Sequence, residues 1–236
     1  MITRKFYHKE TVMNIKADID IIDKLIEETL FQRKQLERYI QKNPFFYSSY
    51  EPVEVEKNAP GIVKEMAEAG KLCDVGPMAA VAGAIAEFSV RKGIELGAKK
   101  IIIENGGDIC CYMDLENDEN ENDEFIIKIF SGNSKISNKI GFKLKPEGIL
   151  GICTSSASVG HSISFGESDS VTVISKNTLV ADAAATAIGN AVKGEVVESV
   201  QKGIEFAKKL PIDGVMIIRE GHIGTYGKLP EIIEID

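Results

Sequence analysis

The feature that most constrains the fold of this chain is a pair of helical segments built almost entirely from small side chains. One lies within Pro77–Leu96 and contains MAAVAGAIA, and the other, Ala181–Val192, begins ADAAATAIG. Side chains this short leave room for another backbone or a flat ligand to approach the helix, and small residues are also common in packed cores. Two interpretations therefore stay open, a tightly packed core pair or the wall of a ligand site. The two segments are also candidates for equivalent parts of two halves.

The rest of the sequence places helices and strands in blocks. Helical periodicity runs from Asp18 to Gln41, inside an N-terminal helical segment of about residues 14–42, and strand-like segments begin at Lys100. Because helices and strands come in blocks and do not alternate strictly along the chain, we expect an α+β fold with largely antiparallel sheets packed with helices. At roughly 150 residues per domain, 236 residues predict a single domain over 1–236, in which two halves share a core.

The charge balance excludes some classes of partner. The chain has 28 basic and 36 acidic residues, a net charge of −8. Such a chain repels phosphate backbones and anionic membranes, so we expect neither nucleic acid nor a membrane as a partner. No charge-free stretch combines the roughly 20-residue length of a membrane span with an apolar composition, since the longest, Gly148–Gly166, is rich in Ser and Gly. The first residues lack the apolar core of a signal peptide. Together with four cysteines that lack zinc-site spacing, this predicts a cytoplasmic protein.

A hydroxyl-rich stretch, Gly151–Ser170, is the richest in chemical groups. Its hydroxyls and backbone amides suit a phosphate or another anion, and the candidates for that contact are Thr154, Ser155, Ser156 and Gly160. The alternative is a polar loop that joins two strands.

Two side chains of the same stretch are candidate catalytic groups. His161 has the pKa range for proton transfer from a hydroxyl or thiol, unless it only hydrogen-bonds its own loop. Cys153, at the end of an apolar strand, is a candidate nucleophile or sulfur carrier if a cation lowers its pKa, and a buried inert thiol otherwise.

Two further segments contain candidate ligand-binding oxygens. Asp182 and Thr186 lie four residues apart, on one face of a helix, and offer hard oxygens to Mg²⁺. The alternative is that Asp182 is the N-cap of that helix. Gly106 and Gly107 form a hairpin turn or permit a ligand to touch the backbone, and Asp108 after them is placed to bind a hydroxyl or a metal-bound water.

Taken together, four segments resemble a largely archaeal family of ApbE-like proteins, cytoplasmic distant relatives of the FAD:protein FMN transferase. The resemblance implies an ApbE-like fold in two related halves with a cleft between them, Mg²⁺ and FAD or FMN as cofactors, and a flavin nucleotide as the small-molecule ligand. The segments are VGPMAAVAGAIAE (75–87), ENGGDI (104–109), GICTSSASVGHSISFGESD (151–169) and ADAAATAIGN (181–190).

The resemblance also implies roles for individual residues. Asp182 and Thr186 match the metal-binding Asp and Thr of the transferase's A-D-A-x-x-T helix. The transferase's Gly-Gly-Asp turn is shared through Gly106, Gly107 and Asp108. His161 falls near the histidine that acts as a base in the transferase. Two features of the transferase are missing: no Asp-Pro pair follows the histidine, and Ala79-Ala80-Val81 replaces a segment that contains a lysine.

Three functions follow as hypotheses. The first is a flavin-nucleotide-binding protein or Mg²⁺-dependent transferase related to ApbE. The second is a sulfur-relay protein in which Cys153 carries a persulfide during sulfide assimilation toward cysteine and homocysteine, as the resemblance implies for some archaeal members. The third is a non-catalytic binding subunit, alone or as a homo-oligomer.

Overall fold

The largest element of the computed structural model is an eight-stranded sheet in which every neighbouring pair is antiparallel. The structure describes residues 1–115, 124–132, 137–156 and 166–235. In spatial order the strands are β1 (Ile2–His8), β2 (Thr11–Ala17), β3 (Lys100–Asn105), β4 (Asp108–Met113), β7 (Gly148–Ser155), β8 (Ser170–Ser175), β9 (Gly214–Arg219) and β10 (His222–Gly227).

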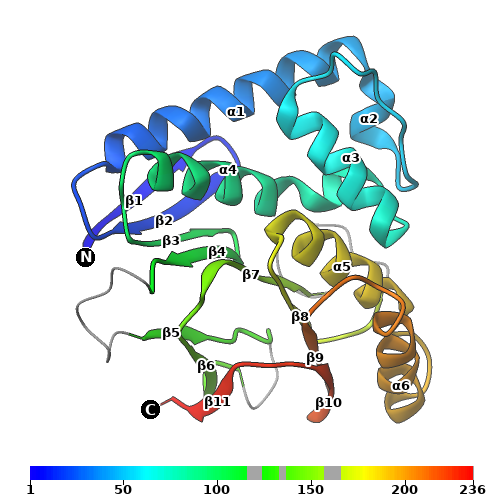
Figure 1. Ribbon diagram of the computed structural model, residues 1–236. Helices are drawn as coiled ribbons and strands as arrows, with labels where there is room; N and C mark the ends of the chain where they lie inside the picture. Colours follow the sequence, from blue (N-terminus) through cyan, green and yellow to red (C-terminus); the bar gives the residue numbers. More distant parts are fainter. Residues whose placement is uncertain (116–123, 133–136, 157–165, 236) are drawn as a thin grey trace.

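Helices cover one face of this sheet, and a smaller sheet lies against the other (Figure 1). The helices are α1 (Ile22–Lys42), α2 (Pro44–Ser48), α3 (Gly61–Cys73), the 3₁₀ helix η1 (Pro77–Ala80), α4 (Val81–Glu95), α5 (Thr178–Ala191) and α6 (Val196–Ala207). The smaller, antiparallel sheet has the order β11 (Glu231–Glu234), β6 (Ile140–Leu144) and β5 (Phe125–Lys128). The predicted α+β class is confirmed.

The element order reveals two related halves. Strands β1 and β2, then helices, then β3 and β4 make the first half, and β7 and β8, then helices, then β9 and β10 make the second. The small-residue helix α4 precedes a strand pair, whereas α5 follows one. Their equivalence stays a prediction, since each helix lies between two strand pairs of its half, and the two helices pack against each other.

Two apolar layers flank the large sheet because strand side chains alternate between its faces. Cys110 packs under the helices with Ile103 and Val173, whereas Cys111 packs under the small sheet with Phe142 and Met216. The two adjacent cysteines thus lie on opposite faces of the sheet.

The N-terminal segment differs from the prediction. Residues 14–17 belong to strand β2, and helix α1 begins only at Ile22, so the helical segment is not 14–42. The reason is the alternation in TVMNIKA, where Thr11, Met13, Ile15 and Ala17 are buried while Val12 and Lys16 are exposed. The expected end of the segment at about residue 42 is confirmed, since α1 ends at Lys42 and Pro44 disfavours helix at the residue before it.

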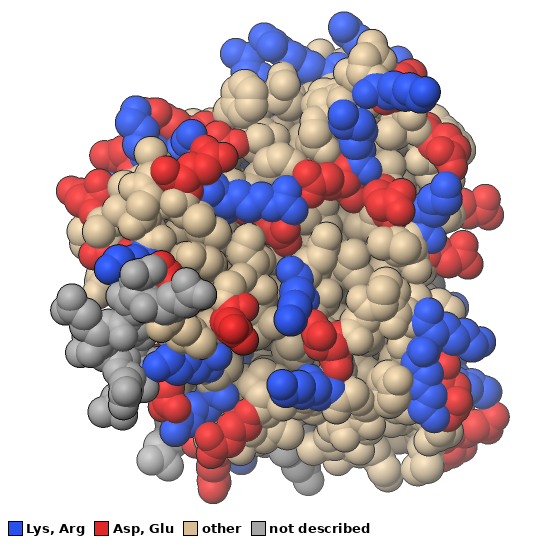
Figure 2. All heavy atoms as spheres, in the orientation of Figure 1, with Lys and Arg blue, Asp and Glu red and all other residues tan. Residues whose placement is uncertain are grey.

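Charges of both signs are interspersed over the face shown in Figure 2. Within the described residues, no single helix combines the length and apolar composition of a membrane span. Helix α3 together with Pro77–Glu95 meets that test only as a pair, and the two parts are bent by 106°.

Candidate active site

The start of helix α5 decides between the two interpretations of Asp182. Asn177 is the N-cap, since its side chain accepts a hydrogen bond from the Val180 amide at 2.9 Å. The N-cap interpretation of Asp182 is therefore wrong. Its Oδ2 instead accepts a hydrogen bond from the Gly83 amide, 2.8 Å away, in the first turn of α4.

Glycine at position 83 makes this contact possible. A Cβ atom there would lie 2.6 Å from the Thr178 carbonyl oxygen and 2.9 Å from the Asp182 Cβ. Gly151 has the same role on strand β7, where a Cβ atom would lie 2.6 Å from the Thr178 Cα. Small side chains on both helices thus serve a close approach of backbones, and the tightly packed core interpretation holds for this part of α4 and α5.

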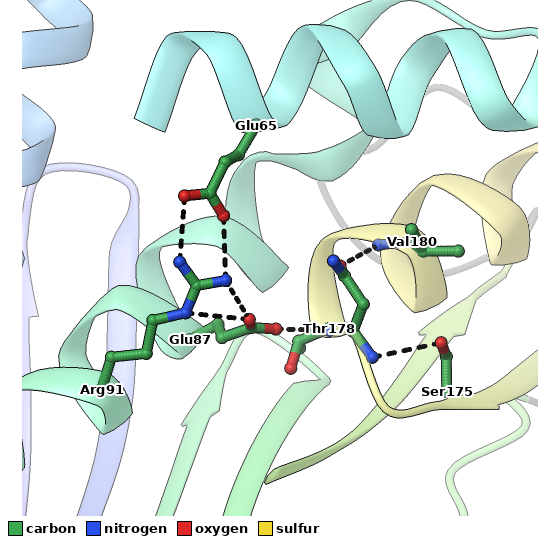
Figure 3. A network of polar contacts seen from close by, with 7 residues as sticks. Glu65, Glu87, Arg91, Ser175, Thr178 and Val180 are labelled. Atoms are coloured by element: carbon green, nitrogen blue, oxygen red, sulfur yellow. Dashed lines mark hydrogen bonds and ion pairs between the residues drawn. The ribbon is translucent and has the colours of Figure 1, made fainter. Parts of the chain in front are cut away.

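A second contact between these helices runs in the reverse direction. Glu87 of α4 is 3% exposed, and its Oε2 accepts a hydrogen bond from the Thr178 amide at 2.5 Å. Its Oε1 accepts from Arg91 at 3.1 Å from Nε, and Arg91 also pairs with Glu65 of α3 at 2.9 Å (Figure 3). Each small-residue helix therefore supplies a carboxylate to amides near the start of the other, where the helix dipole favours negative charge.

Asp108 enters the site from the large sheet. It follows the turn Gly106-Gly107, whose φ angles of 66° and 105° confirm the predicted hairpin. On strand β4, Asp108 has the parity of Cys110, so its side chain points toward the helices. Its Oδ1 accepts a hydrogen bond from the Thr154 amide at 3.3 Å. Burial raises the pKa of Asp108 to about 7.

The two aspartates influence each other. Burial raises the pKa of Asp182 well above its usual range, and the negative charge of Asp108 raises it further, against the opposing effect of the Gly83 and Ala82 amides. Among the described residues, no lysine or arginine contributes to the pKa of either aspartate. The structure thus brings together two buried carboxyl groups with no compensating cation from the described side chains.

The oxygens at this position suit a hard divalent cation. Asp182 and Thr186 are both buried and lie one turn apart on α5, so one helix face offers a carboxylate and a hydroxyl. Asp108 adds a second carboxyl group nearby. This donor set fits the Mg²⁺ that the resemblance implies, although no cluster of three or more His, Cys, Asp or Glu suited to a metal occurs among the described residues.

The hydroxyl-rich stretch divides between the two faces of the sheet. Thr154 pairs its hydroxyl with that of Thr172 at 3.0 Å, on the face toward the small sheet and away from Asp182. Ser155 shares the helix-side parity of Cys153 and is buried, with no hydrogen-bond partner for its hydroxyl among the described residues. Ser156 is also buried. His161 and Gly160 lie outside the described residues.

The surroundings of Cys153 oppose a role in sulfur transfer. Its side chain is completely buried, and its Sγ lies 3.6 Å from the Thr178 carbonyl oxygen. Burial and the nearby charges of Asp108 and Asp182 raise the pKa of this thiol well above its usual range. Because a nucleophilic cysteine needs a thiolate, this environment supports the buried, inert interpretation.

Glu87 is the residue of this site that sequence reasoning missed. The sequence does contain a signal for this residue. Glu87 directly follows the eleven uncharged residues 76–86 and lies four positions after Gly83. A carboxylate on the small-residue face of a helix needs buried partners, which indicates a polar contact with the neighbouring helix.

Two hollows among the described residues lie elsewhere. One, of about 390 Å³, lies between the end of α1 and residues 56–60, and the other, of about 260 Å³, lies between residues 52–57 and α3. Neither is lined by Asp108 or Asp182, so these hollows are not the candidate site.

Comparison with solved structures shows which class of fold this is. The chain is similar to the flavin transferase ApbE from Vibrio cholerae, with a TM-score of 0.60 and 16% identity over 95% of this chain and 96% of that one. It is also similar to the apo form of the Pseudomonas stutzeri flavinyl transferase ApbE, with a TM-score of 0.62 and 14% identity over 95% and 94% of the two chains. The fold is therefore that of ApbE.

Sequence comparison gives the family. The model described as AbpE bacteria matches residues 3–211, and the chain belongs to that family. Among its relatives is a UPF0280 protein of Methanocaldococcus jannaschii, 47% identical over 234 residues, which cover 97% of this chain and 91% of that protein. A UPF0280 protein of Methanobrevibacter smithii is 42% identical over 229 residues, covering 94% and 93%.

Proposed function

We propose that this protein binds a flavin nucleotide together with Mg²⁺, and that it catalyses a reaction related to the transfer of FMN. Asp182 and Thr186 would hold the metal, and the charge of Asp108 acts on Asp182. When bound, Mg²⁺ would neutralise phosphate charge and polarise a phosphoryl oxygen as a Lewis acid. The flavin part of this proposal rests on the family resemblance and the ApbE fold.

One observation carries the metal part. Asp108 and Asp182 come from different halves of the chain, yet each is buried and the charge of one raises the pKa of the other. Two buried like charges destabilise the folded protein unless a proton or a cation compensates them. A divalent cation bound by both carboxylates would supply that compensation.

The protein's own groups would have distinct tasks in this site. The Gly83 amide orients the Asp182 carboxylate, and the Thr154 amide orients that of Asp108. Asp108, with a pKa of about 7, is suited to hold or release a proton near neutral pH. His161 remains the proposed base for the acceptor hydroxyl.

Binding and transfer require separate experiments. The lysine and the Asp-Pro pair that this chain lacks belong to the transferase's own reaction, so their loss bears on transfer. Binding of FAD is measured by fluorescence with and without Mg²⁺, for the wild type and for Asp182→Asn. We expect Mg²⁺-dependent binding that the variant weakens by about 100-fold, since a principal ligand is lost. Asp23→Asn is the matched control, because Asp23 is an exposed aspartate at the start of α1.

Transfer is then tested by incubating the protein with FAD, Mg²⁺ and a threonine-containing acceptor, followed by mass spectrometry of the acceptor. An increase by the mass of FMN supports the transferase. Binding without such an increase supports a non-catalytic flavin-binding subunit. Absence of FAD binding, or binding that neither Mg²⁺ nor Asp182→Asn alters, contradicts the proposal.

A further inference from the structure

We infer that Glu87 is a positioning residue, which fixes helix α5 so that the oxygens of Asp182 and Thr186 meet at one metal ion. This inference rests on the proposed metal site and extends it to a residue that supplies no ligand.

The geometry of the helix pair supports this role. Gly83 and Glu87 lie four residues apart on α4, and the groups that they bind, Asp182 and the Thr178 amide, lie four residues apart on α5. Two contacts spaced by one turn on each helix fix both the sliding and the rotation of α5 against α4. The Gly83 amide holds the ligand's carboxylate, and Glu87 holds the backbone from which that ligand projects.

The carboxylate of Glu87 is itself held rigidly. Arg91 donates to its Oε1 from Nε at 3.1 Å and from Nη2 at 2.5 Å, and the same guanidinium contacts Glu65 of α3 (Figure 3). The Oε2 atom then has one partner among the described contacts, the Thr178 amide. The ion pair thereby orients Glu87 toward the first residue of α5.

Packing leaves α5 little freedom to recover if this contact is lost. Residues 178–189 of α5 are all buried, and Thr178 is wedged between Gly83 and Gly151. Without Glu87, the Thr178 amide would be a buried donor without an acceptor, which is unfavourable. The start of α5 would shift to reach another acceptor, and Asp182 would move with it.

The test is the affinity for Mn²⁺, a spectroscopic substitute for Mg²⁺, measured by electron paramagnetic resonance on the whole chain. Glu87→Gln keeps the size of the side chain, but its amide nitrogen must face either the Thr178 N–H or the Arg91 guanidinium. We expect a dissociation constant about 10-fold higher than in the wild type, as for other residues that orient metal ligands.

Glu65→Gln is the matched control. It alters the partner of the same arginine, and among the described residues no hydrogen bond or ion pair is given from Glu65 to α5, so we expect a dissociation constant within about twofold of the wild type. All measurements are made well below the unfolding temperature of each protein. If Glu87→Gln does not fold, Glu87→Asp replaces it, because the shorter carboxylate keeps its charge but cannot reach both Arg91 and Thr178.

The outcomes separate the inference from the proposed function. If the wild type binds Mn²⁺ and the Glu87 variant binds it with the same affinity, the positioning role is overturned and the metal site stands. This holds even if the unfolding temperature of the variant falls. Equal weakening by Glu65→Gln also overturns it. A wild-type protein that binds no Mn²⁺ overturns the metal site and this inference together.

Discussion

The two faces of the large sheet are packed in opposite ways. Toward the small sheet lies a hydrophobic cluster with Phe142, Ile152 and Met216 among its members, and the polar groups beside it include the paired hydroxyls of Thr154 and Thr172, which carry no charge. Toward the helices the apolar cluster surrounds three buried carboxyl groups, those of Glu87, Asp108 and Asp182. Burying a carboxyl group is costly unless it is bonded or paired, whereas apolar packing has no such cost. The contrast supports our proposal that the face toward the helices binds a ligand, whereas the other face contributes to stability.

The largest expected effect comes from the apolar face. Phe142→Ala removes a completely buried ring and should lower the free energy of unfolding by about 3–5 kcal/mol. The affinity of the folded protein for Mn²⁺ should stay unchanged, because the ring lies on the face away from Asp182. Denaturant titration gives the first quantity and paramagnetic resonance the second. A large loss of metal affinity would remove the division between the two faces.

A pair of glycine substitutions sharpens the comparison. Gly83→Ala places a methyl group 2.6 Å from the Thr178 carbonyl oxygen. Gly141→Ala places one 2.8 Å from the Ile127 carbonyl oxygen, in the small sheet. Both should lower stability by about 1–3 kcal/mol. Only Gly83→Ala should also weaken Mn²⁺ binding, because it moves α5 away from α4. Equal metal affinity in the two variants would contradict our description of the helix pair.

The dependence of stability on pH is the third expected effect. Asp108 has a pKa of about 7 in the folded protein and about 4 when unfolded, so the folded state holds more protons between these values. The metal-free protein should therefore lose stability, by about 3 kcal/mol, as the pH rises from about 4 to about 7. Asp108→Asn should flatten this loss, and Mg²⁺ should offset it at pH 8. Thermal unfolding across this range provides the measurement, and a wild type that gains stability over it would contradict the assignment.

The smallest expected effect belongs to Cys153. Replacing this buried thiol by alanine should cost about 1 kcal/mol of stability and leave FAD and Mn²⁺ affinities within about twofold. Cys73→Ala, at another buried cysteine, is the matched control. Loss of binding or of FMN transfer in the Cys153 variant alone would show that the thiol has a chemical role after all.

Much of this arrangement could be predicted from the sequence where local rules decide it. The Gly106-Gly107 turn, the end of α1 before Pro44 and the small-residue character of α4 and α5 follow from residue types at fixed positions. Strand β2 was missed because its alternation covers only seven residues next to a long helix.

The contacts between helices could not be predicted in this way. Asp182 is bonded by an amide 99 positions earlier in the chain, and Glu87 by one 91 positions later. No local pattern states which helix start a carboxylate will meet. For Asp182 the sequence therefore allowed an N-cap in its own helix, whereas the fold presents it to the start of another.

Soaking crystals of the protein in Mn²⁺ and computing an anomalous difference map would test the central claim most directly. We predict a peak within coordination distance of Asp182 and Thr186, next to Asp108, that disappears in Asp182→Asn. Peaks confined to surface carboxylates, with none between α5 and strand β4, would contradict a metal site at these aspartates.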